Sequence, residues 1–176
     1  YHAAAKASRH LTPRDRVVVI GAGGLGHIGI QVLKALTAAE IVVVDRNADA
    51  VKLALSIGAY HGVVADGTHI DQVLDLTGGQ GGEAVIDFVG EGGATAEGIA
   101  MLRQAGNYHV VGYGENIDVP TIDIVSSEIN VIGNLVGSYN DLCDLMALAA
   151  RGSVVLHTAK YALDDFQSAI DDLDAG

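Results

Sequence analysis

A strand-like run that leads directly into a glycine-rich loop constrains this chain more than any other feature. The run Arg16–Ile20 is rich in β-branched residues, which indicates a strand buried on both faces. Residues 21–26 follow with the pattern G-x-G-x-x-G, and apolar residues then recur at helical spacing from Leu25 to Leu36. A strand, a glycine turn and a helix in this order are typical of the βαβ unit that binds dinucleotides.

The glycines of the loop have separate mechanical roles in such a unit. Gly21 allows the tight turn, Gly23 lets the backbone approach a pyrophosphate, and Gly26 lets the helix pack against the strand. Gly24 and Leu25 complete the loop, whose N–H groups at the helix start would face the phosphates. A glycine-rich turn with no ligand is the alternative interpretation.

An acidic residue ends the second predicted strand, which covers residues 41–44. This residue, Asp45, lies about twenty positions beyond the loop, where the carboxylate can accept hydrogen bonds from both hydroxyls of an adenosine ribose. A 2′-phosphate there would meet a like-charge repulsion on the order of 1–4 kcal/mol, which favours NAD over NADP. The adjacent Arg46 could partner a 2′-phosphate; beside Asp45, we expect it to lie over the adenine or to point into solvent.

The rest of the chain alternates predicted strands and helices. Further strands are expected at residues 61–64, 84–89, 108–111, 131–136 and 158–161, and helices between Asn47 and Gly58 and at residues 70–76, 94–104, 142–149 and 166–173. The glycine-rich residues 77–82 are expected to form a flexible crossover. This order predicts an α/β Rossmann fold, a doubly wound parallel sheet of about six strands with helices on both faces.

Composition excludes several other classes of protein. The net charge is −12 with only ten Lys and Arg, which argues against nucleic-acid binding. No uninterrupted apolar run reaches the ~18 residues of a membrane-spanning helix. The single cysteine, Cys143, cannot form an intrachain disulfide or a Cys-rich zinc site, and the seven histidines show no metal-binding spacing. We therefore expect a cytoplasmic domain with no metal ligands of its own.

Other chemically capable residues have structural interpretations that we prefer. His27 is expected to be a partly exposed helix residue, and Cys143 to lie near the apolar core. Asp87, at the end of a predicted strand, is expected to bond local backbone, although it faces the edge of the sheet where a ligand would bind. The chain starts at Tyr1 and stops just after a predicted helix, so residues 1–176 are expected to be one domain cut from a longer polypeptide.

Several segments together resemble one known family. They are Tyr1-His-Ala-Ala-Ala-Lys6, the run from Val17 through the loop to Gln31, Val42-Val-Val-Asp-Arg-Asn47, Leu76-Thr-Gly-Gly-Gln-Gly81, Val85-Ile-Asp-Phe-Val-Gly90, Val110-Val-Gly-Tyr-Gly114 and residues 134–142. In this register the chain resembles, over nearly its whole length, the cofactor domain of medium-chain, zinc-dependent alcohol dehydrogenases. It is similar above all to the bacterial NAD-dependent secondary-alcohol dehydrogenases.

The resemblance implies a set of cofactor contacts. Besides the glycine loop and Asp45, it implies that Phe88, Val89 and Gly90 flank the cofactor, that Val111, Gly112 and Tyr113 lie near the nicotinamide, and that Leu135 and Val136 offer backbone groups to its carboxamide. It also implies that the zinc ligands and proton relay lie on a separate catalytic domain, so no catalytic or metal residue is assigned here. The parent enzyme would transfer a hydride between an alcohol and NAD, whereas the isolated chain would bind NAD with little turnover.

The resemblance further implies a homo-oligomer, because family members associate through the edge strand, here from Val131 to Val136. Two alternative functions remain open at this point. One is a stand-alone nucleotide-sensing module, such as the regulatory domains of potassium channels, which share the glycine loop and distal acid. The other is a methyltransferase, although no antiparallel strand pair is evident near the C-terminus.

Overall fold

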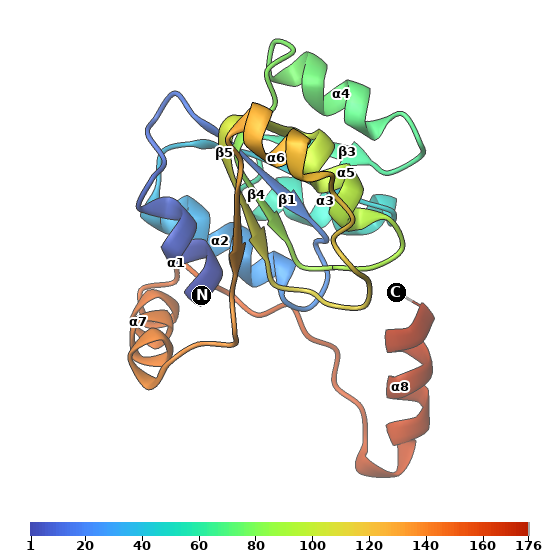
Figure 1. Ribbon diagram of the computed structural model, residues 1–176. Coiled ribbons are helices and arrows are strands. Elements are labelled where there is room, and N and C mark those ends of the chain that lie inside the picture. The colour runs from blue at the N-terminus through green and yellow to red at the C-terminus, as the bar shows by residue number, and fades with distance from the viewer. Residues whose placement is uncertain (176) are drawn as a thin grey trace.

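All six strands of the sheet are parallel, in the order β3-β2-β1-β4-β5-β6 (Figure 1). The structure is a computed structural model that describes residues 1–175. The strands are β1 (Arg16–Ile20), β2 (Glu40–Asp45), β3 (His61–Val64), β4 (Gly82–Asp87), β5 (Leu102–Val110) and β6 (Asn130–Gly133). The helices are α1 (His2–Ser8), α2 (Gly26–Leu36), α3 (Ala48–Ile57), α4 (His69–Leu76), α5 (Ala94–Ala100), α6 (Thr121–Ser127), α7 (Tyr139–Ala150) and α8 (Phe166–Ala175), the last preceded by the 3₁₀ turn η1 (Leu163–Asp165).

The strand order confirms the predicted doubly wound α/β fold. The chain winds outward from β1 to β3 and then returns to place β4 on the other side of β1. At this reversal, crossovers leave β1 and β4 on opposite faces of the sheet, which opens a crevice at the carboxyl ends of the two strands.

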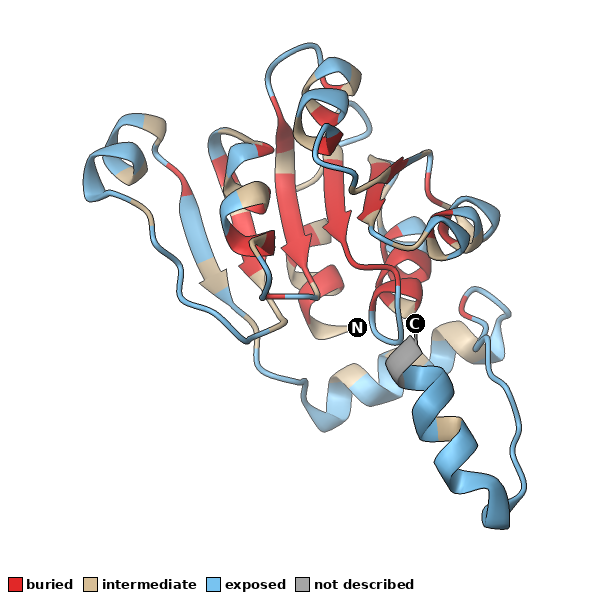
Figure 2. Cartoon of the chain, turned by 90° about the vertical axis from the view of Figure 1, so that its right-hand side faces the viewer, coloured by how far each residue is buried: buried red, intermediate tan, exposed pale blue. Residues whose placement is uncertain are grey.

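Alternating side chains of the central strands form two apolar clusters, one on each face of the sheet. Figure 2 shows that the central strands are buried along most of their length. Val17 and Val19 pack on one face with residues of α1, α2 and α3, whereas Val18 and Ile20 pack on the other with residues of α4 and α5. Because β1 is buried on both faces, its sequence is a continuous apolar run rather than an alternating one. The same explanation applies to β2.

The prediction of a helix over residues 94–104 is wrong in its second half. Helix α5 is shorter because Met101 is fully buried and its carbonyl oxygen accepts a hydrogen bond of 2.8 Å from the N–H of Gly82, at the start of β4. The chain is therefore already in the sheet where the exposed Gln104 suggests a helix surface, and β5 begins well before the predicted residue 108.

The edge of the sheet also differs from prediction. The strand predicted up to Val136 ends at Gly133, because the next side chain, Asn134, donates to the carbonyl oxygens of Val110 and Ile132 at 3.2 and 2.9 Å. Val136 then takes a positive φ of 44°, which lies outside the β region of backbone conformations.

Residues 158–161 form no strand, so that prediction is wrong as well. All of these residues are exposed in an extended connection to α8, which lies apart from the sheet in Figure 1 and has no buried residue between Phe166 and Leu173.

Two helices were not expected. Helix α1 buries Ala3, Ala4 and Ala7 against the core, but three alanines make a weak apolar signal. Helix α6 has only seven residues and buries none of them, with Ile122 and Val125 66% and 70% exposed, so it is too short to show a helical repeat in the sequence. No helix of the described residues is long and apolar enough to cross a membrane.

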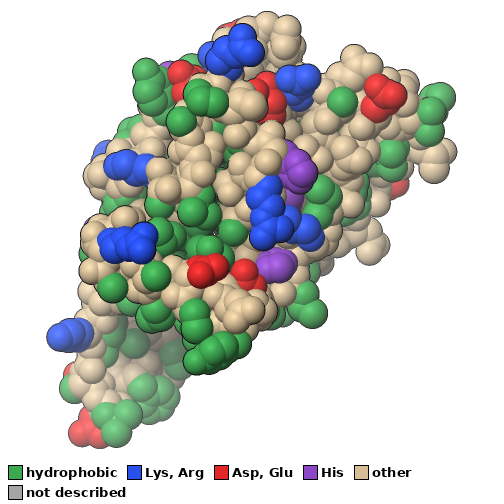
Figure 3. Space-filling model, turned by 90° about the vertical axis from the view of Figure 1, so that its left-hand side faces the viewer, with side chains coloured by type: hydrophobic (Ala, Val, Ile, Leu, Met, Phe, Trp, Pro, Cys, Tyr) green, Lys and Arg blue, Asp and Glu red, His purple; other side chains and the backbone are tan. Residues whose placement is uncertain are grey.

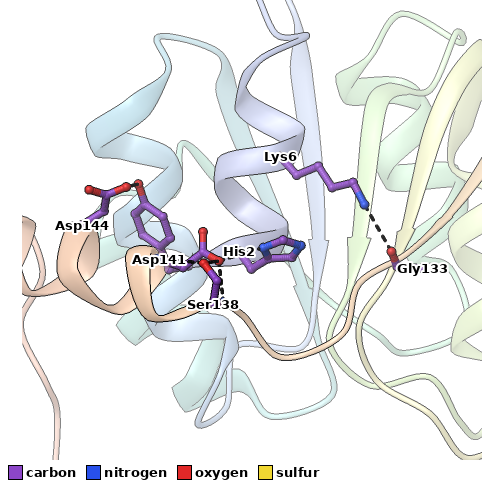
Figure 4. A network of polar contacts seen from close by, with 7 residues as sticks. His2, Lys6, Gly133, Ser138, Asp141 and Asp144 are labelled. Carbon is purple, nitrogen blue, oxygen red and sulfur yellow. Dashed lines mark hydrogen bonds and ion pairs between the residues drawn. The ribbon is translucent and has the colours of Figure 1, made fainter.

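A polar network fastens α7 to α1 (Figure 4). The Asp141 carboxylate accepts hydrogen bonds of 2.7 Å from the backbone N–H and the hydroxyl of Ser138 and lies 3.1 Å from Nδ1 of His2. These contacts, the Ser138 backbone first, lower the pKa of Asp141 to about 2. On the same helix α1, Lys6 donates to the carbonyl oxygen of Gly133 in β6. On the face shown in Figure 3, the Lys and Arg side chains are spread over the surface.

A buried carboxylate lies among the apolar side chains of the core. Asp87, at the end of β4, is fully buried, and its Oδ2 accepts a hydrogen bond of 2.6 Å from the hydroxyl of the fully buried Tyr108 on β5. Burial, followed by this contact, raises the pKa of Tyr108, so its hydroxyl stays protonated and donates. The pair joins neighbouring strands at the crevice.

We expect Tyr108→Phe to lower the free energy of unfolding by about 1–3 kcal/mol, because Asp87 would lose a buried donor. Chemical denaturation at neutral pH measures the effect. Tyr60→Phe is the matched control, since Tyr60 is 66% exposed. Equal stability of the two variants would show that the Asp87 contact contributes nothing.

Candidate functional site

The glycine loop has a backbone shape that requires glycine at two of its positions, Gly21 and Gly26. Gly21 has a φ of +87°, and a Cβ there would lie 2.8 Å from a methyl group of Val89. A Cβ on Gly26 would lie 1.9 Å from the carbonyl oxygen of Gly21, so the first turn of α2 packs directly on the end of β1. The turn and the close packing predicted from the sequence are both present.

The middle of the same loop faces open space. A Cβ on Gly23 or Gly24 would meet no atom within 4 Å, and both glycines are exposed. With Gly21, Leu25 and Gly26 they line a hollow whose other walls are Asp45, Phe88 and Val89. No side chain caps the start of α2. Exposed backbone at an uncapped helix start suits an anionic group such as a pyrophosphate.

Asp45 is fixed at the edge of this hollow by the backbone. Its Oδ2 accepts from the N–H of Ala22, within the loop, and its Oδ1 accepts from the N–H of Asn47, each at 2.7 Å. A carboxylate oxygen has more than one acceptor site, so both oxygens can still accept from a ligand hydroxyl. The carboxylate is therefore oriented in advance for a diol such as ribose.

Arg46 points across the crevice. Its Nη2 donates to the carbonyl oxygen of Gly92 at 2.8 Å, while the residue remains exposed. This contact ties the end of β2 to the segment before α5. The sequence predicted Arg46 to lie over an adenine or in solvent; the residue borders a second hollow beside Asp45.

The second hollow contains residues that the sequence analysis missed. Besides Gly21, Asp45, Arg46 and Val89, it is lined by Ile20, Val44, Ala65, Ala94 and Glu97. Ile20 is the last residue of β1 and Val44 the last but one of β2, at the edge of the sheet where a ligand site at the switch point would be sought. Glu97 could have been suggested by its place in the first turn of the helix that follows β4.

Asp87 shapes the turn formed by Phe88, Val89 and Gly90. Its Oδ1 accepts from the N–H groups of Val89 and Gly90 at 2.8 and 2.9 Å, as expected of an acid that bonds local backbone. Its carbonyl oxygen accepts from Val111 and Gly112, both at 2.9 Å. Side chains would not fit between the two turns, since a Cβ on Gly90 would lie 2.2 Å from the backbone of Gly112.

The remaining predicted contacts lie outside the two hollows. The Tyr113 side chain is 92% exposed, and Leu135 and Val136 are 86% and 91% exposed. Val136 lines a separate hollow with residues of α7 and with Tyr1. Their assignment to the nicotinamide therefore stays a prediction.

Two expectations about single residues are wrong. His27 is buried rather than partly exposed, because it packs under the loop with its Nδ1 3.0 Å from the carbonyl oxygen of Gly23 and its ring edge-on to His157. Cys143 is exposed rather than near the core, because α7 buries none of its residues. Among the side chains that the structure describes, no group of three or more from His, Cys, Asp or Glu is placed to hold a metal ion.

Comparison with known proteins agrees with this geometry. An NAD-dependent alcohol dehydrogenase of Sulfurisphaera tokodaii is 34% identical over 99% of this chain and 51% of its own length. A D-arabinose 1-dehydrogenase (NADP(+)) of Saccharolobus solfataricus is 33% identical over 91% of this chain and 46% of its own. The crystal structure of an alcohol dehydrogenase from Aeropyrum pernix matches with a TM-score of 0.96 and 37% identity, covering 99% of this chain and 51% of that one.

The chain thus spans about half the length of the relatives it matches. The sequence pattern described as zinc-binding dehydrogenase matches residues 24–151, which include the helix after the glycine loop, Asp45 and both turns of the crevice. This chain belongs to the zinc-binding dehydrogenase family.

Proposed function

We propose that residues 1–176 are the NAD(H)-binding domain of an alcohol dehydrogenase that transfers a hydride between an alcohol and NAD to give a ketone or aldehyde. The observation that carries the proposal is the exposed backbone of Gly23 and Gly24 beside the fixed carboxylate of Asp45. The names of the relatives support the reaction class.

The residues of the chain bind and orient the dinucleotide. The loop N–H groups would hold the pyrophosphate, Asp45 the adenosine ribose, and the turns at Val89 and Gly112 the nicotinamide end. When bound, NAD supplies the ring carbon that accepts the hydride. In this proposal the zinc ligands belong to a separate catalytic domain of the same polypeptide, so the chain alone binds NAD with little or no turnover.

NAD is favoured over NADP on electrostatic grounds. Asp45 presents a negative charge where a 2′-phosphate would lie, and Arg46, the nearest cation in sequence, is bonded to Gly92. The name of the 33% identical D-arabinose 1-dehydrogenase includes NADP(+), so the preference for NAD over NADP is tested directly.

We expect the chain to bind NADH at least about tenfold more tightly than NADPH in calorimetric titrations, because of the repulsion at Asp45. Asp45→Asn should reduce that ratio to about threefold or less by removing the charge. Asp71→Asn, which removes the same charge from an exposed site on α4, should leave the ratio unchanged. Binding of S-adenosylmethionine without binding of either dinucleotide would overturn the proposal.

A second test separates ligand binding from folding. Gly23→Ala should fold with unchanged stability, because its Cβ meets no protein atom, yet weaken NADH binding by about tenfold or more where the pyrophosphate needs the space. Gly133→Ala is the control, since its Cβ also meets no atom within 4 Å. Unchanged NADH affinity of the Gly23 variant would contradict the assignment of the loop.

We also propose a homo-oligomer formed through β6, the edge strand of the sheet. Val131 is 43% exposed there, and the strand has one unpaired side. Light scattering on a sizing column should give at least twice 18.1 kDa at micromolar concentration. A single species of monomer mass would remove this part of the proposal.

A cytoplasmic location is also part of the proposal. It is supported by the exposed free thiol of Cys143, which a reducing compartment preserves.

A further inference from the structure

The second hollow, beside Asp45, has apolar walls and three charged side chains. Its apolar surface comes from Ile20, Val44, Ala65, Val89 and Ala94, and its charges beyond Asp45 come from Arg46 and Glu97. If Asp45 holds the adenosine ribose, as proposed above, the base attached to that ribose must enter this hollow. Apolar walls suit the faces of a purine, but they do not distinguish one purine from another.

Glu97 is held in this hollow by a contact from a different element. Its Oε2 lies 3.2 Å from Nε2 of His69, in the first turn of α4, and the His69 side chain is only 4% exposed. The contact has the distance of an ion pair without the alignment of a strong hydrogen bond. Because the His69 imidazole is buried and fixed in place, this contact restricts where Glu97 can point.

The other oxygen of Glu97 remains available. The side chain is about a third exposed, at 33%. Its Oε1 lies 3.8 Å from the position that a Cβ on Gly93 would occupy, so the absence of a side chain at the start of α5 leaves this oxygen uncovered. The N–H groups of Gly93 and Thr95 are bonded to Glu115 instead, so they do not compete for Glu97.

We propose that Glu97 determines the base specificity of the dinucleotide by accepting a hydrogen bond from the exocyclic 6-amino group of adenine, with His69 as its positioning residue. A carboxylate only accepts hydrogen bonds, and adenine offers a donor at that position. Hypoxanthine and guanine carry a carbonyl oxygen there, which a carboxylate repels. The hollow therefore selects 6-aminopurine dinucleotides.

The arrangement of the charges favours this role over that of a solvated ion pair. Arg46 is a donor-only group already bonded to Gly92, and so it does not neutralise Glu97 by any contact seen here. A buried or half-buried site built to pair with a donor discriminates strongly against a ligand that lacks it, because the acceptor is then left unpaired.

The experiment compares NADH with reduced nicotinamide hypoxanthine dinucleotide, which differs at the 6-position of the purine, by calorimetric titration of the whole chain. The native protein should bind NADH about tenfold or more tightly. Glu97→Gln should bring the two affinities within about threefold, because an amide can donate to the carbonyl oxygen. Glu91→Gln is the matched control: it makes the same charge change near the crevice, and Glu91 does not line the hollow.

His69→Leu tests the positioning role. Loss of the buried imidazole can lower stability by itself, so the readout is the ratio of the two affinities, which we expect to fall at least about threefold while NADH still binds. Equal affinities of the native protein for both dinucleotides, or a ratio that Glu97→Gln leaves unchanged, would overturn this inference and leave the NAD(H) proposal standing. No binding of either dinucleotide would overturn both.

Discussion

The contact between the first turn of α2 and the carbonyl oxygen of Gly21 is the constraint on which the site depends. With no side chain at Gly26, the helix begins directly on the end of β1, and the exposed backbone of Gly23 and Gly24 is turned toward the crevice. Asp45 then fastens this loop to β2 through the N–H of Ala22. One close approach thus places the helix start, the open glycines and the carboxylate at a common edge.

The opposite wall of the crevice has a comparable anchor in Asp87. Its side chain accepts hydrogen bonds from the turn after β4, and its carbonyl oxygen accepts them from the turn after β5. The hydroxyl of Tyr108 donates to the other carboxylate oxygen. A buried carboxylate is costly unless it is fully hydrogen-bonded, and here three donors meet it. The wall is consequently built from backbone whose position does not depend on surface side chains.

The parts of the fold that could be predicted from the sequence are those with a local signature. The runs that form β1 and β2, the glycine loop, and the helix capped by Asn47 and ended by Gly58 all lie where they were expected. The limits of α5 and β6 could not be predicted, because they are set by distant partners such as Gly82 for Met101. Glu97 was missed for the same reason: its neighbour His69 is distant in sequence.

The net charge of −12 repels any ligand that carries phosphates, so the position of each acidic side chain relative to the glycine loop matters. Residues 21–26 contain no charged side chain, so in the proposed complex the backbone N–H groups at the start of α2 would hold the phosphates. Asp45 borders both hollows and Glu97 lines the second one, where a ribose and a base would present neutral donors. In the proposed complex these acids would accept hydrogen bonds from hydroxyl and amino groups, and the negative charge that disfavours a further phosphate at Asp45 would give the site its selectivity.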